Sequence, residues 1–161
     1  MRIIWAPSAE SEFNRSLAEW LSEQIYGDER QLKTPNLCFG VFDGSKLKGA
    51  VAFHDWNPRF GTVEFSAASR DESWLSRAVI REIARYAFDE LNCQLLVTQN
   101  DPEDTRVIRI IKALGFDQIL IPNLRGKNLA GSFMTLTVEQ RNASRFIRSS
   151  VKPSISAMQL N

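Results

Sequence analysis

The fold is decided by the stretch TVEFSAASRDESWLSRAVIREIARYAF, residues 62–88. Residues 62–69 alternate apolar and polar side chains, as a half-buried strand does, and apolar residues recur at helical spacing from Leu75 onward. The order is therefore strand, short loop and helix start. Unpaired N–H groups and the macrodipole at a helix start can bind an anion, although this loop lacks the glycines that usually let a phosphate approach closely.

Strand-like and helical patterns alternate on both sides of this junction. The predicted elements, in order, are a strand at 1–5, a helix at 9–26, strands at 37–43, 46–55 and 62–69, a helix from 75 to about 92, a strand at 93–99, a helix at 104–115, and strands at 116–121 and 132–138. Gly44-Ser45 predicts a hairpin turn, 122–131 a loop, and 138–150 a further helix. This order predicts an α/β fold with a mixed, mostly antiparallel sheet of six to seven strands flanked by helices.

The whole chain has the size and composition of one domain. Its 161 residues are 43% hydrophobic and carry a formal net charge of +1. We expect a single domain over 1–149 and a flexible tail at 150–161. The near-neutral charge disfavours nucleic acid as a partner. No apolar run could span a bilayer and the first residues lack a signal-peptide pattern, so we expect a cytoplasmic location and no membrane partner.

The two cysteines, Cys38 and Cys93, lie in apolar, strand-like runs without the spacing of metal ligands. Cysteine is among the most frequently buried residue types. We therefore expect two buried free thiols, no disulfide and no metal site.

Two polar residues near the junction could move protons. Strand parity places Glu64 on the same face as Ser66 and opposite Phe65, so Glu64 is either a base, acting directly or through water, or an ordinary exposed carboxylate. His54 is the only histidine. Its ordinary pKa suits proton transfer, although a lone histidine often has a structural role.

A longer succession runs from GAVAFHDWNPRFGTVEFSAAS through SRDESWLSRAVIREIARYAF to VTQNDPEDTRVIRIIKALGF. It resembles the core of the GNAT-superfamily N-acetyltransferases, particularly ribosomal-protein-type and small phage or prophage members. The resemblance covers about residues 37–137 and is most specific in KALGF, which is similar to the family's closing leucine-glycine-phenylalanine turn. It implies a GNAT fold and transfer of an acetyl group from acetyl-CoA to an amine of a protein or small molecule, by direct attack in a ternary complex.

The resemblance also implies where acetyl-CoA binds. In this family the strand before the phosphate loop pairs with the pantetheine arm, and N–H groups of the loop bind the pyrophosphate. The implied cofactor-binding residues are Ser66, Ala67, Ala68, Arg70, Ser73, Trp74, Leu75, Ser76 and Arg77, with Asp104 at the position of a family asparagine. Arg70 and Arg77 are the expected charge partners of the phosphates, and Ser73 is also a natural helix N-cap.

Two departures from the family pattern bear on the activity. Asp71, Trp74 and Ser76 occupy the key positions of the pattern Q/R-x-x-G-x-G/A, so both glycines are missing. Ile111 stands where many members have a tyrosine acid. The candidate catalytic residues remain Glu64 and His54, and no acid is identified. A second possibility is a noncatalytic acyl-CoA-binding or protein-interaction module on the same scaffold. A nucleobase modifier on this scaffold is disfavoured by the near-neutral charge. The chain could also form a homodimer.

Overall fold

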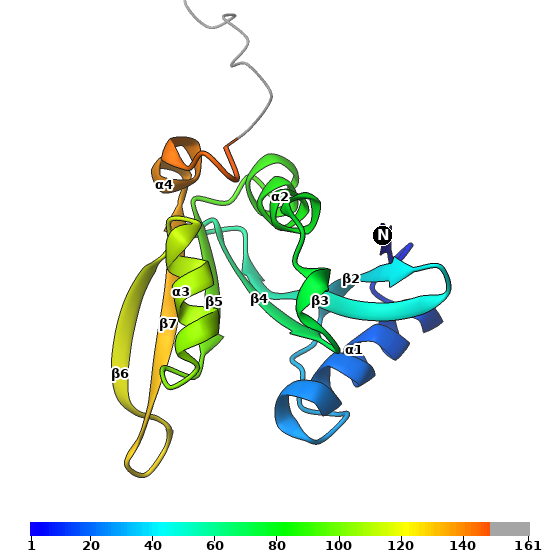
Figure 1. Ribbon diagram of the computed structural model, residues 1–161, viewed down its shortest axis with the longest axis horizontal. Coiled ribbons are helices and arrows are strands. Elements are labelled where there is room, and N and C mark those ends of the chain that lie inside the picture. Colours follow the sequence, from blue (N-terminus) through cyan, green and yellow to red (C-terminus); the bar gives the residue numbers. More distant parts are fainter. Residues whose placement is uncertain (149–161) are drawn as a thin grey trace, which may run out of the picture.

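Seven strands form one sheet in the computed structural model, which describes residues 1–148 (Figure 1). The order across the sheet is β1-β2-β3-β4-β5-β7-β6. The strands are β1 (Arg2–Trp5), β2 (Asn36–Asp43), β3 (Lys46–Asn57), β4 (Thr62–Ser69), β5 (Leu95–Asn100), β6 (Asp117–Gly126) and β7 (Leu129–Thr137). The helices are α1 (Glu12–Tyr26), α2 (Arg77–Arg85), α3 (Thr105–Ala113) and α4 (Val138–Ala143), with a 3₁₀-helix η1 (Glu72–Trp74) before α2 and a π-helical turn η2 (Tyr86–Glu90) after it. The predicted mixed, mostly antiparallel sheet flanked by helices is confirmed.

One neighbouring pair of strands, β4 and β5, is parallel, and the two are joined over a short length. Pairing runs from Thr62 opposite Leu95 to Glu64 opposite Val97 and then stops. Beyond this point β4 continues along β3, and β5 continues along β7. The two halves of the sheet therefore part beyond Glu64 (Figure 1).

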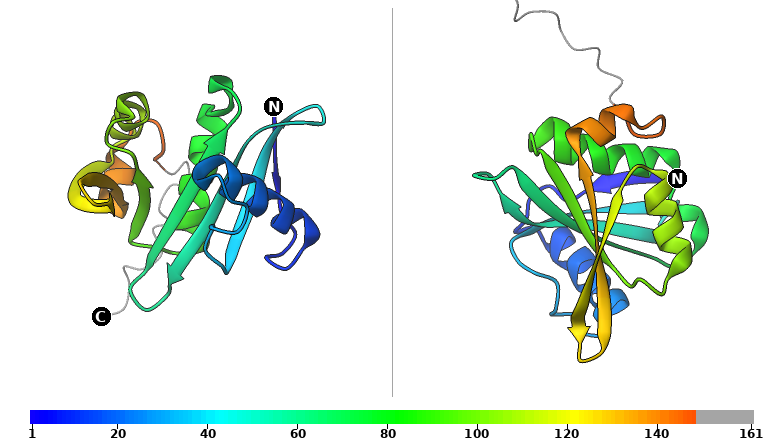
Figure 2. Two further views of the ribbon diagram at one scale, coloured as in Figure 1. Left: turned by 90° about the horizontal axis from the view of Figure 1, so that it is seen from below. Right: turned by 90° about the vertical axis from the view of Figure 1, so that its left-hand side faces the viewer.

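Helices cover both faces of β2–β4, with α1 on one side and α2 on the other (Figures 1 and 2). Alternate strand residues sort accordingly into two cores. The core under α1 contains Leu17, Leu21, Cys38, Ala50 and Ala52. The core under α2 contains Phe39, Val51, Phe53, Val63, Val79 and Ile83. Both cysteines are buried free thiols, as the sequence predicts.

Side-chain caps determine where the helices begin. Ser11 accepts the N–H of Asn14 to cap α1, so this helix begins at Glu12 and not at Ala9. The expectation that Ser73 caps α2 is wrong, because Ser76 accepts the N–H of Val79 and α2 begins at Arg77. Among the described residues, no helix combines the length and the apolar character needed to cross a membrane.

The expected loop over 122–131 instead continues β6 and β7 into one long hairpin. Pro122 does not end β6, because this strand lies at the edge of the sheet, where a missing N–H costs no ladder hydrogen bond. A register shift between Ile121 and Gly126 absorbs the irregularity. The helix expected within 138–150 is α4, which ends at Ala143. Residues 149–161, including the predicted tail, lie outside the described residues.

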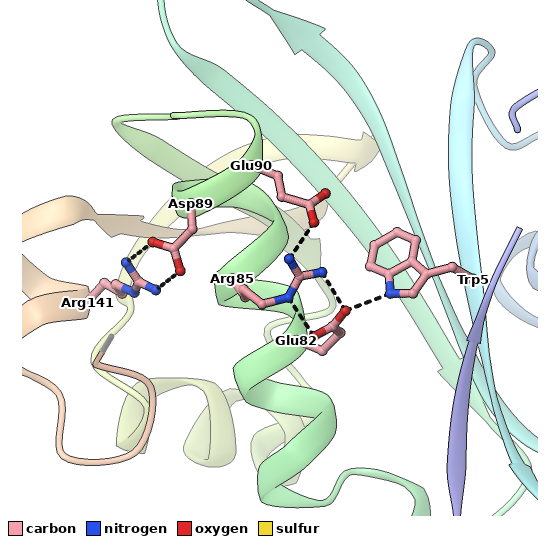
Figure 3. A network of polar contacts seen from close by, with 6 residues as sticks. All are labelled: Trp5, Glu82, Arg85, Asp89, Glu90 and Arg141. Carbon is pink, nitrogen blue, oxygen red and sulfur yellow. Dashed lines mark hydrogen bonds and ion pairs between the residues drawn. The ribbon is translucent and has the colours of Figure 1, made fainter. Parts of the chain in front are cut away.

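Charged side chains attach the helical segment α2–η2 to the strand β1 and to α4 (Figure 3). Buried Arg141 of α4 donates from both terminal nitrogens to the carboxylate of Asp89, at 2.8 and 2.6 Å. On the other side, Glu82 accepts from the indole Nε1 of Trp5 at 2.6 Å and from Arg85 at 2.7 Å. The helix that follows the phosphate-loop position is thus held in place from both sides.

Arg141→Ala is expected to lower the free energy of unfolding by about 3 kcal/mol, because the mutation leaves Asp89 without its bidentate partner. The side chain of Asp89 is 36% exposed, so water offsets part of the loss and the effect stays at the low end for a buried pair. Urea unfolding measures the change. Arg109→Ala, at an exposed arginine of α3, is the control and should change stability by less than about 0.5 kcal/mol. Equal stability of the two variants would contradict the role of the Asp89 pair.

Candidate active site

A cavity of about 300 Å³ lies where β4 and β5 part, on the side of the sheet that faces α2 and α3. Apolar side chains make up most of its lining, including Phe65, Ala67, Ile80, Ile83, Ile110 and Ile111. Its polar lining residues are Ser69, Glu72, Thr98, Asn100 and Arg106. A concave, mostly apolar site with a few polar groups is the usual form of a small-molecule pocket.

Asn100, at the end of β5, contributes a polar atom with no partner. Its Oδ1 is buried and accepts no hydrogen bond from the described residues. Buried polar atoms in proteins are normally paired. An unpaired carbonyl oxygen on a residue that lines the cavity therefore offers an acceptor to a ligand N–H.

The loop before α2 is shaped by Trp74. This side chain is buried and also lines the cavity. Its ring packs on Gly49 of β3 so closely that a Cβ at Gly49 would lie 2.6 Å from it. The indole thus takes up space that would be open in a glycine-containing loop, and the loop takes its conformation from side-chain packing.

Asp71 also shapes this loop, and its charge is matched. Its carboxylate lies 2.5 Å from Nζ of Lys48 and accepts the N–H of Ser73 at 3.0 Å. The hydrogen bonds from Lys48 and Ser73 lower the pKa of Asp71 to about 2, so the group is ionised and paired at neutral pH. The first N–H groups of α2, on Arg77 and Ala78, have no acceptor within the helix by position. The start of α2 therefore offers N–H donors to an anion, although the loop before it contains no glycine.

An ion pair joins the loop to α3 beside the cavity. Glu72 of η1 and Arg106 of α3 both line the cavity and contact each other directly. Arg106 is a cation suited to a phosphate group, and Glu72 now neutralises it.

The opposite face of β3 and β4 carries a hydrogen-bonded chain of three side chains. His54 is 3% exposed, and its Nε2 lies 2.9 Å from Oγ of Ser66. Its Nδ1 lies 2.7 Å from Oδ2 of Asp55. Asp55 has a φ of 52°, uncommon outside glycine, at the irregularity that interrupts pairing between β3 and β4.

Charged groups surround this chain. Glu64 lies beside it and accepts from the amide of Gln99 at 2.9 Å. Lys33 approaches Asp55 to 3.4 Å. Burial raises the pKa of Asp55, but the hydrogen bond with His54 and the charge of Lys33 outweigh burial and leave this pKa below its ordinary value. One ligand atom from each of His54, Asp55 and Glu64 lies within 4.8 Å of the others, so the three could hold a metal ion.

The sequence-predicted site residues divide between the two faces of the sheet. Those that line the cavity are Ala67, Ala68, Trp74 and Leu75. The side chain of Ser66 instead contacts His54 on the other face. Arg70 also lies away from the cavity, with its guanidinium carbon 5.6 Å from the ring centroid of Trp20 in α1.

The remaining predicted residues lie around helix starts. Ser76 and Asp104 cap α2 and α3. Ser73 donates to Asp71, and Arg77 is exposed at the first position of α2.

Sequence reasoning missed Thr98 and Arg106 and left Asn100 without a role. Thr98 and Asn100 share one face of β5 by parity, a signal that the sequence does carry. The sequence does not show that this face borders the gap beside β4, because that depends on where the parallel pairing ends.

No family model matches the chain, and no curated protein matches it in sequence. Solved structures do match. Mutant forms of the spermidine/spermine N-acetyltransferase SpeG from Vibrio cholerae are 15% identical, with a TM-score of 0.68 over 86% of this chain and 95% of theirs. The same enzyme in complex with manganese ions is 16% identical, with a TM-score of 0.63 over 88% and 94%. The Salmonella typhimurium protein yncA, assigned as an acetyltransferase and solved with its cofactor acetyl-CoA, is 18% identical, with a TM-score of 0.63 over 86% and 94%.

These likenesses establish the fold as that of the GNAT N-acetyltransferases, as the sequence resemblance predicts. They do not support the narrower resemblance to ribosomal-protein-type and phage members, which stays a prediction.

Gly49→Ala is expected to destabilise the protein by about 1–3 kcal/mol, because the added methyl group overlaps the ring of Trp74. Chemical denaturation of Gly49→Ala, Trp74→Leu and the double variant measures the coupling between the two sites. The glycine substitution should cost less in the Trp74→Leu background. An equal cost in both backgrounds would show that the ring is not what excludes the methyl group.

Proposed function

We propose that the chain is an acetyl-CoA-dependent N-acetyltransferase that acts by direct transfer in a ternary complex. The observation that carries this proposal is the cavity itself, which opens where β4 and β5 part and lies beside the start of α2. The site combines an unpaired strand edge, an apolar channel and N–H donors at a helix start. These features suit, in turn, the amide groups, the apolar length and the phosphates of a long phosphorylated thioester.

In this proposal acetyl-CoA extends from the loop at 70–76 along β4. The N–H groups at the start of α2, with Arg77, receive the pyrophosphate. The backbone at Ala67 and Ala68, where β4 has no strand neighbour on the β5 side, pairs with the pantetheine arm. The unpaired Oδ1 of Asn100 accepts from a pantetheine amide N–H. The thioester then lies near Ser66 and Glu64, at the point where the strands part.

Proton removal from the acceptor amine is assigned to Glu64, directly or through a water molecule, with His54 as the second candidate. Glu64 is partly exposed and lies at the parting of β4 and β5, so its carboxylate can reach a group held there. Cysteine chemistry does not fit, because burial raises the pKa of Cys38 to about 12 and burial also raises the pKa of Cys93. The acyl group therefore passes to the amine without a cysteine intermediate.

The acceptor is an amine of a small molecule or a protein. The carboxylates of Glu64 and Asp55 on the α1 face favour a cationic amine, and the solved SpeG enzymes of this fold are spermidine/spermine N-acetyltransferases. Use of acetyl-CoA agrees with the cytoplasmic location expected from the sequence. A homodimer stays an expectation.

A noncatalytic acyl-CoA-binding module is the second candidate. Two observations favour it: Trp74 fills part of the loop, and Ile111, on the cavity wall, offers no proton donor. Calorimetric titration with acetyl-CoA tests binding, and release of CoA thiol with a panel of amines then separates an enzyme from a binder. No binding at millimolar acetyl-CoA in a folded sample would exclude both candidates.

Glu72→Gln is expected to tighten acetyl-CoA binding severalfold, because it frees the guanidinium of Arg106 for a phosphate group. Titration calorimetry at low and high salt measures the effect, which should shrink as salt screens it. Glu103→Gln removes the same charge from an exposed position before α3 and should change affinity less. Equal gains from the two variants would indicate a general effect of net charge.

Glu64→Gln is expected to lower turnover by about a hundredfold while preserving the fold and acetyl-CoA affinity, because an amide cannot take the amine proton. The ratio of wild-type to variant rates should fall as pH rises, since more of the amine is then already deprotonated. Rates at saturating acetyl-CoA across a pH series measure this. The control is Glu19→Gln, at an exposed position of α1. Wild-type turnover in Glu64→Gln at every pH would exclude Glu64 as the base.

A further inference from the structure

The proposed reaction lacks an acid on the cavity side. The departing CoA thiolate must be protonated, yet the cavity wall carries Ile111 at the position where a tyrosine is expected. The polar cavity residues do not replace it, because Ser69, Thr98 and Asn100 are not acids at neutral pH, and Glu72 and Arg106 are paired with each other. A proton donor has to come from elsewhere near the point where β4 and β5 part.

The chain Asp55–His54–Ser66 has the geometry of such a donor. With the Asp55 carboxylate accepting from Nδ1–H, the imidazole can exchange a proton with Ser66 only through Nε2, which lies 2.9 Å from Oγ. The hydroxyl both donates and accepts, so it can pass a proton onward. Ser66 is partly exposed, whereas His54 behind it is buried. Asp55 is exposed at the other end of the chain, so Ser66 is the end that a ligand running along β4 can reach.

Ser66 lies where the proton donor is required, near the point where β4 and β5 part. It lies on the same face as Glu64, two residues beyond the last residue of β4 that pairs with β5. The proposed acetyl-CoA arm runs along Ala67 and Ala68 toward this point, which brings the thioester sulfur beside Ser66. This step rests on the proposed function.

We propose that Ser66, His54 and Asp55 form a proton relay that protonates the CoA thiolate. When the tetrahedral adduct collapses, the C–S bond breaks and the sulfur takes the proton of the Ser66 hydroxyl. Ser66 takes the Nε2 proton of the imidazolium, which leaves neutral His54 with Nδ1–H bonded to Asp55. Glu64 has a carboxylate oxygen within 4.8 Å of a ring nitrogen of His54, and it returns the proton of the amine to His54 through a water molecule. The products are the amide and the free thiol, and the relay is restored.

The relay also depends on the charged groups around the ring, because these hold the ring proton on Nδ1 and leave Nε2 to Ser66. The charged groups facing the ring are Asp55 of β3, Glu64 of β4 and Lys33 in the segment before β2. On the α1 side the neighbour of this region is neutral, since Asn14 bonds to Asn36, which pairs with His54 across β2 and β3. Asp55→Asn replaces the carboxylate with an amide, which can donate to Nδ1 and so favours the neutral tautomer protonated on Nε2.

Nuclear magnetic resonance of His54 provides a readout that does not depend on activity, because the chain has a single histidine and its ring signals need no assignment. The neutral ring should carry its proton on Nδ1. Asp55→Asn should shift the neutral ring toward the Nε2–H tautomer and lower turnover. A neutral wild-type ring protonated on Nε2, or wild-type turnover in an Asp55→Asn variant whose tautomer has changed, would overturn the relay.

Ser66 variants complete the test. Ser66→Ala should lower turnover roughly tenfold to a hundredfold at unchanged acetyl-CoA affinity, and Ser66→Thr should restore most of it because it keeps a hydroxyl. Thr62→Val, four residues earlier on the same strand face, is the control and should stay within about twofold of wild type. Wild-type turnover and pH profile in Ser66→Ala would overturn the relay alone. Acetyl-CoA binding by wild type without transfer to any amine would overturn the proposed function and the relay with it.

Discussion

The short parallel pairing of β4 with β5 is the constraint on which the rest of the structure depends. Strand β4 also pairs with β3, and β5 also pairs with β7. Each half of the sheet is therefore stable without further pairing between β4 and β5. Pairing stops after Glu64 and Val97, which leaves facing strand edges unpaired and opens the cavity. A fully paired sheet would bury these backbone groups against each other and leave no place for an extended ligand.

Near the point where β4 and β5 part, both faces of the sheet carry groups of the candidate site. The apolar cavity lies on the side of α2 and α3, while His54, Glu64 and Ser66 lie on the side of α1. The proposed reaction needs an apolar channel for one substrate and charged groups for the other, and this arrangement supplies both in one small domain. The conformation of the loop proposed to bind phosphate depends on side chains, since Trp74 packs on Gly49 and Asp71 pairs with Lys48.

Much of this arrangement can be predicted from the sequence, where local patterns determine it. Alternation in 62–69 and the four-residue spacing from Leu75 predicted the central strand and helix, and parity placed Glu64 with Ser66. Pro122 misled the prediction of β6, because the sequence does not mark which strand lies at the edge. The contact of Ser66 with His54 depends on the β3–β4 register, which the turn at 57–61 sets together with the irregular backbone of Asp55. Arg106 was missed because its partner Glu72 lies 34 positions earlier.

Strand β6 forms one edge of the sheet, and its two halves pair differently with β7. Along β6, Ile119 and Leu120 are more than half exposed, and regular pairing with β7 extends from Asp117 to Ile121. Beyond Ile121 the proline, the register shift and an ion pair from Arg125 to Asp101 make the strand irregular and hold its tip toward β5. Such irregularity prevents a foreign strand from adding along the whole length of the edge. At this edge of the sheet, extension by a strand of another polypeptide is therefore limited to about the first half of β6, a segment too short to nucleate fibrous aggregation readily.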